Sequence, residues 1–147
     1  MSKYRPMLFL ICVAFSILAS CTNAGGGIPD SAALSITGNV TKPIGWIEED
    51  VLKMDSVEVE AENKDGEVKT YKGVKINTLL ALTELSSGAK ILEFIGEDGA
   101  TAEISLAELQ SCNDCIISFR SQGGFSVVLP GFPGKLQIKG VMELRVK

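Results

Sequence analysis

The stretch that decides the fold is LSITGNVTKP, residues 34–43. Leu34, Ile36 and Val40 alternate with polar residues, which is the two-residue period of a half-buried β-strand. Pro43 ends this pattern, because proline has no backbone N–H to donate to a sheet. We therefore expect a globular domain that opens with a strand.

Two β-hairpins are predicted further along the chain. Each is signalled by an Asp-Gly pair between alternating apolar residues, at Asp65-Gly66 and at Asp98-Gly99. The strands that flank them are expected at 57–59 and 68–71 for the first hairpin, and at 91–95 and 102–104 for the second. These local signals favour antiparallel pairing.

Three short helices are predicted by apolar spacing and by capping residues. The first covers residues 47–54 and has acidic residues near its start. The second covers 76–85 and stops before Gly88. The third begins at Ser105, whose partner Glu108 three residues on completes a capping box.

The rest of the chain is expected to form three more strands, at 116–120, at 125–129 and at 136–146 with a break at Gly140. Mostly antiparallel strands with two or three short helices define an α+β fold. We expect residues 33–40 to pair with strands late in the chain. The residues predicted to be buried are Leu79, Leu80, Ile91, Ile104, Ile117 and Val128.

The first residues are typical of an export signal. Lys3 and Arg5 precede an almost wholly apolar run over 7–18, which is shorter than the roughly 20 residues that span a bilayer. The run ends in Leu-Ala-Ser-Cys21, which resembles the bacterial lipobox. We therefore predict a signal peptide at 1–20, a fatty-acylated Cys21 that anchors the protein to a membrane, and a flexible tether over 21–32.

Composition narrows the function. Removing residues 1–20, with two basic residues and no acidic one, changes 14 basic and 18 acidic residues to 12 and 18. An acidic exported domain of 127 residues is a poor candidate for binding nucleic acid. Histidine is absent from the whole sequence, which excludes histidine-dependent nucleophiles, histidine-ligated zinc and histidine-ligated haem.

A series of motifs over residues 33–146 resembles the molybdopterin-binding domain of the sulfite oxidase family. The resemblance depends on the order and spacing of these motifs, because each motif alone is a common feature of strands, turns or helices. The resemblance implies that family's catalytic-domain fold for residues 33–147. The motifs are the opening series 34–43, Glu49-Asp50-Val51-Leu52, the segment 71–80, Asp98-Gly99, the helix 106–109, Val127-Val128-Leu129-Pro130-Gly131, Gly134 and Lys139.

The same resemblance argues against the family's redox chemistry. The family's molybdenum-ligating cysteine falls on Ala61, and its arginine before the valine-proline segment falls on Ser126. Its tryptophan falls on Gly140, while its lysine is kept as Lys139. Ala61, Ser126 and Lys139 would then mark a residual ligand pocket, with no cofactor expected and molybdopterin as the alternative.

Cys112-Asn113-Asp114-Cys115 is a second candidate site. In an oxidising exported compartment this spacing fits a local disulfide or idle thiols. A thiol redox pair and a zinc site are the other interpretations. Zinc would need two further ligands, and without histidine these would be carboxylates or a partner chain.

These observations predict a membrane-anchored lipoprotein of the bacterial cell envelope, facing the periplasm or the exterior. Its domain is expected to be a non-catalytic module that binds a small ligand or a protein partner. The alternative is an oxidoreductase component that uses molybdopterin or the cysteine pair.

Overall fold

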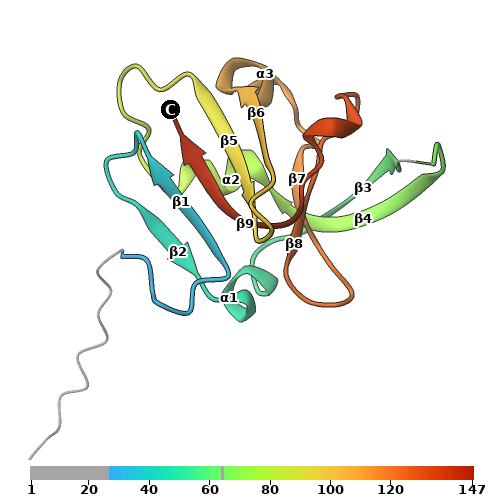
Figure 1. Cartoon of the computed structure of the whole chain (residues 1–147), viewed down its shortest axis with the longest axis horizontal. Coiled ribbons are helices and arrows are strands. Elements are labelled where there is room, and N and C mark those ends of the chain that lie inside the picture. Colours follow the sequence, from blue (N-terminus) through green and yellow to red (C-terminus); the bar gives the residue numbers. More distant parts are fainter. Residues whose placement is uncertain (1–26, 64) are drawn as a thin grey trace, which may run out of the picture.

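The computed structural model describes residues 27–63 and 65–147, which form a mixed nine-stranded sheet with three short helices (Figure 1). The α+β prediction is confirmed. The elements in chain order are β1 (Leu34–Gly38), β2 (Ile44–Trp46), α1 (Glu48–Leu52), β3 (Val57–Glu62), β4 (Val68–Lys75), α2 (Ile76–Ala81), β5 (Ile91–Gly96), β6 (Thr101–Ser105), α3 (Leu106–Ser111), β7 (Ile116–Phe119), β8 (Phe125–Val128), the 3₁₀ turn η1 (Gly134–Leu136) and β9 (Lys139–Val146).

The last strand, β9, organises the sheet. It pairs in parallel with β1 and antiparallel with β5 and β8, so the predicted pairing of the opening residues with a late strand is confirmed. The strand order is β2-β1-β9-β8-β7-β4-β3, and β6 joins through β5. Figure 1 shows β2 near one end of this path, while β3 and β4 extend as a curved arm at the other.

Both predicted hairpins are confirmed. β3 pairs with β4 from Val57↔Gly73 to Glu62↔Val68, and β5 pairs with β6 from Ile91↔Ser105 to Ile95↔Thr101. Each turn uses its glycine at positive φ, +79° at Gly66 and +82° at Gly99, where a side chain would be strained.

The first and third helices also agree with the prediction. α1 places Glu48, Glu49 and Asp50 in its first turn. At α3, the backbone N–H of Glu108 donates to Ser105 Oγ over 3.2 Å, and this hydroxyl donates to the Glu108 carboxylate. Ser105 is therefore the N-cap, as predicted, and Glu108 contacts its hydroxyl instead of completing the reciprocal capping box.

The second helix is shorter than predicted, because tertiary contacts end it. α2 stops at Ala81, where the Thr83 hydroxyl is buried and donates to the Lys42 carbonyl over 2.9 Å. Leu85 then forms a β-bridge with Val40 instead of continuing the helix. The last strand likewise begins at Lys139, three residues later than predicted, because the chain first makes the turn η1.

The main core lies between the helices and the inner face of β1, β9 and β5. Leu79, Leu80, Ile104, Ile117 and Val128 are buried as predicted, with Val128 in a second, smaller cluster. The prediction for Ile91 was wrong, because its side chain is only half-buried. The strand period turns Leu92 and Phe94 toward the core and leaves Ile91 on the opposite face with Glu93.

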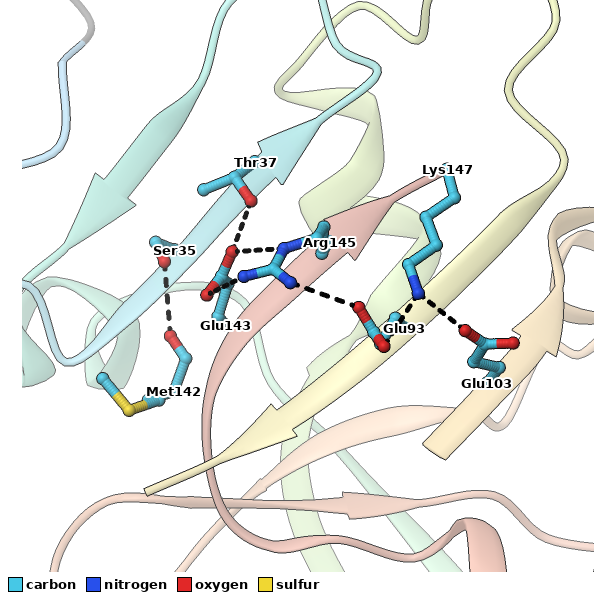
Figure 2. A network of polar contacts seen from close by, with 8 residues as sticks. All are labelled: Ser35, Thr37, Glu93, Glu103, Met142, Glu143, Arg145 and Lys147. Carbon is cyan, nitrogen blue, oxygen red and sulfur yellow. Dashed lines mark hydrogen bonds and ion pairs between the residues drawn. The ribbon is translucent and has the colours of Figure 1, made fainter. Parts of the chain in front are cut away.

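That opposite face of β1, β9, β5 and β6 carries a chain of ion pairs (Figure 2). Glu93 is contacted by Arg145 at 3.5 Å and by Lys147 at 2.8 Å, and Lys147 also reaches Glu103 at 2.7 Å. Arg145 continues to Glu143 at 3.1 Å. The hydrogen bonds to Glu103 and Glu93 raise the pKa of Lys147. Each of these charged side chains is therefore paired with at least one side chain of opposite charge.

The predicted signal peptide, Cys21 and the first part of the predicted tether lie outside the described residues. The described part of the tether makes a turn in which Ala32 N–H donates to the Pro29 carbonyl over 2.9 Å. Ile28 and Pro29 lie against Gly45 of β2, where an added Cβ would come within 3.0 Å of Ile28 Cγ2. Among residues 27–63 and 65–147, no helix is long and apolar enough to cross a membrane.

Candidate functional site

A polar groove of about 500 Å³ lies over β4, β7, β8 and the start of β9. Its volume falls in the range of small-molecule sites. The lining residues are Asn63, Asp65, Lys69, Tyr71, Ser118, Phe119, Arg120, Ser121, Gln122, Ser126, Val127, Val128, Gln137 and Lys139.

Strand register explains why these side chains converge. Gly73 pairs with Ser118, Ser118 with Ser126, and Ser126 with Lys139, so one row crosses β4, β7, β8 and β9. Tyr71 stands on the same face as Gly73, two residues earlier. A Cβ at Gly73 would lie 2.1 Å from the Ile117 carbonyl oxygen, so only glycine allows this close approach of β4 to β7.

The structure places the three predicted pocket residues on this side of the sheet. Ser126 and Lys139 line the groove as cross-strand neighbours. Ala61 pairs with Lys69 on β3 and is buried with Val128 in the smaller apolar cluster, against which Tyr71 packs. Ala61 is not a lining residue, but Val128 and Tyr71 belong to both the cluster and the groove.

The charged side chains that line the groove are mainly positive, whereas the chain as a whole carries a net negative charge. Lys69, Arg120 and Lys139 line the groove together with one carboxylate, Asp65, although the whole sequence has net charge −4. Lys69 lies 3.1 Å from Glu67, and the hydrogen bonds that Glu67 accepts from Lys69 and then from Asn63 lower its pKa. The groove therefore offers donors and positive charge to a ligand.

The turn between β7 and β8 positions Arg120. Gly124 N–H donates to Glu48 Oε1 over 2.9 Å, which ties this turn to the start of α1. Gly123 and Gly124 take positive φ values of +88° and +72°, as the tight turn requires. Arg120 N–H also donates to the Gly124 carbonyl over 3.1 Å. The backbone of Arg120 is therefore fixed by the hairpin turn.

At the rim, Glu97 contacts Arg120 and covers Gly140. The Arg120 Nη1 to Glu97 Oε1 distance is 3.4 Å. Glu97 N–H donates to the Gly140 carbonyl over 2.8 Å, and a Cβ at Gly140 would come within 2.5 Å of Glu97 Oε1. The carboxylate of Glu97 therefore fills the space beside Gly140, the position to which the sequence resemblance assigns the family's tryptophan.

Cys112 and Cys115 form a disulfide between α3 and β7. Cys115 is buried in the main core, Cys112 packs against that core, and neither lines the groove. Asn77 Nδ2 donates to the carbonyls of Leu109 and Cys112 over 3.2 and 3.3 Å, which holds α2 against this loop. The disulfide leaves neither sulfur available as a thiolate in this structure.

The residues at the groove do not fit a molybdopterin centre. In the family that the sequence resembles, a protein thiolate binds molybdenum, and Ala61, the position that the resemblance assigns to it, offers only a methyl group. Both cysteines of the described residues are bonded to each other in the other apolar cluster. Within residues 27–63 and 65–147, no group of three or more cysteine or carboxylate side chains is placed to hold a metal ion.

Comparison with known proteins defines the class of fold, a sulfite-oxidase-like α+β domain. No family model and no curated protein matches the sequence. Among solved structures, the chain is similar to the sulfane dehydrogenase SoxCD from Paracoccus pantotrophus, with a TM-score of 0.66 and 20% sequence identity. The match covers 77% of this chain and 37% of that one, so this chain corresponds to little more than a third of that protein's chain. A likeness at this identity establishes the fold alone.

Sequence reasoning did not identify Lys69, Arg120 or Glu97 as site residues. Nothing local marks them, because each is a charged residue at a strand or turn. The row through Gly73 and Ser118 brings Lys69 and Arg120 to the groove, and the pairing of β5 with β9 brings Glu97 beside Gly140. Neither pairing is encoded by a short motif.

Proposed function

We propose that this chain is a cell-envelope lipoprotein whose domain is a non-catalytic module that binds a small polar ligand in the groove over β4, β7 and β8. The observation that carries the proposal is a groove that keeps a polar, positively charged lining beside a buried Ala61. A binding site with its polar groups intact and its metal ligand missing supports recognition without redox chemistry.

The polar groups of the groove are available to a ligand. The side chains of Tyr71, Ser126 and Gln137 make no hydrogen bond to another described residue, although each is only partly exposed. A ligand that bonds to such groups gains affinity, because they are already held in place by a rigid sheet. Ser118 differs, since its hydroxyl donates to the Ser126 carbonyl over 3.3 Å.

Metal analysis of the protein purified from its native host tests the non-catalytic role. We expect no stoichiometric molybdenum and no sulfite or sulfoxide turnover. Ala61→Cys alone should not create turnover, because the rest of the family's site is replaced by Ser126 and Gly140. Stoichiometric molybdenum in the native protein would overturn the proposal and favour an oxidoreductase.

The alternative role as an oxidoreductase component draws support from the fold likeness to a dehydrogenase. For thiol exchange, the half-buried Cys112 would be the sulfur open to attack. A Cys112→Ser, Cys115→Ser variant separates the two roles, since it would abolish thiol exchange and leave ligand binding in the groove unchanged.

The membrane anchor is tested at Cys21. Cys21→Ala should yield an uncleaved precursor or a soluble product, and incorporation of a radioactive fatty acid should disappear. Cys12→Ala is the matched control, because Cys12 lies in the predicted signal peptide and should leave lipidation intact. A Cys21→Ala protein that stays lipidated and membrane-bound would contradict the anchor.

A further inference from the structure

We infer that the groove selects a small organic anion, whose charged group is held between Arg120 and Lys139, and that Glu97 competes with this anion for Arg120. This inference rests on the proposed binding role and names the class of ligand. It also assigns a specificity function to Glu97, a residue outside the groove lining.

Charge at the groove sets the class of ligand. Lys139 stands beside Ser126 in the row that crosses the sheet, and Arg120 lies on the same face two residues beyond Ser118. Arg120 follows β7 and Lys139 begins β9, with β8 between them, and both line the same groove. An anion bound between two cations of one groove relieves the repulsion between them. A planar guanidinium adds directed donors to the point charge of the lysine.

The remainder of the groove suits the uncharged part of such a ligand. Val128 and Tyr71 provide an apolar wall continuous with the cluster that contains Ala61. Ser126 and Gln137 provide a hydroxyl and an amide for hydroxyl or carbonyl groups. A bare inorganic ion would use only the cations and leave these contacts unmade.

Glu97 already occupies one of the positions that a ligand's anion would take. Its carboxylate lies over Gly140 and reaches Arg120, with side-chain exposures of 68% for Glu97 and 29% for Arg120. An ion pair this exposed is weak, so an incoming anion can replace it. The backbone of Glu97 is held separately, by its bond to the Gly140 carbonyl, and need not move.

Equilibrium dialysis of the full detergent-solubilised chain against radiolabelled glucose 6-phosphate and glucose tests this inference. We expect millimolar binding of the phosphate and much weaker binding of the neutral sugar. Arg120→Gln and Lys139→Gln should each weaken binding on the order of tenfold. Glu97→Gln should strengthen binding by roughly two- to fivefold, because it removes the competitor.

Lys53→Gln is the matched control, since Lys53 forms an exposed pair with Glu49 on α1 and does not line the groove. It should leave binding unchanged, and thermal melts of every variant should show that the fold is kept.

Equal binding of glucose and glucose 6-phosphate would overturn the anion inference and leave the binding module standing. Absence of glucose 6-phosphate binding, or unchanged binding in Arg120→Gln, would overturn the inference as well. Weaker binding in Glu97→Gln would overturn the competitor role. Failure of the proposed function is a separate result, stoichiometric molybdenum in the native protein.

Discussion

Two regions of the same sheet use charged residues in different ways. On the face of β1, β9, β5 and β6, Glu93 is contacted by two cations, and each cation reaches a second carboxylate (Figure 2). Over β4, β7 and β8, the groove gathers three cations with one lining carboxylate. Charges that pair with one another stabilise a surface. Lys69 and Arg120 pair with Glu67 and Glu97, which do not line the groove, so positive charge is in excess within the hollow itself and can attract a counter-charge. This difference indicates that the groove, and not the ion-pair network, is where the domain would bind a charged ligand.

The largest effect is expected from the core beneath both regions. Leu80→Ala should lower the free energy of unfolding by about 2–5 kcal/mol, because it leaves a cavity at a side chain that is 5% exposed. Leu82→Ala, at a position that is 52% exposed, should change it by less than about 0.5 kcal/mol. Urea unfolding measures both, and equal effects would contradict the placement of the core.

The ion-pair face should respond next. Glu93→Gln removes the carboxylate that Arg145 and Lys147 share and should lower the free energy of unfolding by about 1–2 kcal/mol, reduced from a fully buried pair because both cations remain partly exposed. Glu60→Gln, an exposed glutamate on β3, serves as the control. Ligand binding should not change in either variant. Loss of binding in Glu93→Gln would contradict the distinction between the ion-pair network and the groove.

Alkaline pH should weaken the same face. The folded-state pKa of Lys147 lies above its ordinary value of 10.5 because Glu103 and Glu93 accept its hydrogen bonds. The stabilisation is therefore complete below the unfolded-state pKa and is lost as the pH rises through the folded-state pKa. Lys147→Gln should flatten this alkaline decline in melting temperature, whereas Lys72→Gln, an exposed lysine on β4, should not. An unchanged decline in Lys147→Gln would argue against the network.

The smallest effect on stability is expected in the groove itself. Lys139 is exposed, so Lys139→Gln should change the free energy of unfolding by less than about 0.5 kcal/mol. Chemical denaturation provides the measurement. A loss of unfolding free energy as large as that of Glu93→Gln would show that Lys139 stabilises the fold. It would then contradict the distinction between the ion-pair network and the groove.

Local chemistry explains which parts of the fold were predictable. The hairpins follow from Asp-Gly turns, and α3 follows from Ser105 and Glu108, because each signal lies within a few residues of the structure it specifies. The end of α2 was misplaced because the Val40–Leu85 bridge joins segments 45 residues apart. Ile91 was misassigned because an apolar residue does not reveal which face of its strand meets the core.

Predicting the groove residues required information of two kinds. Ser126 and Lys139 were found through resemblance to a known family, which carries long-range structure that the residues alone do not express. Arg120 and Glu97 were missed because they belong to different hairpins and meet only in the folded sheet. The sequence showed only that alanine occupies position 61, where the resembling family has a metal-binding cysteine. It did not show that a groove with polar side chains lies beside it.

The contact of Ile28 and Pro29 with Gly45 would limit how far a lipid-anchored domain can stand from the membrane. If Cys21 carries the lipid, seven residue steps separate the membrane surface from the first docked side chain, a span of at most roughly 25 Å. The attachment point is the β2 edge, and the groove lies toward the opposite end of the sheet, beside β4 and β3 (Figure 1). Such a tether would hold the domain by its β2 edge and leave the groove, toward the other end of the sheet, open to solutes.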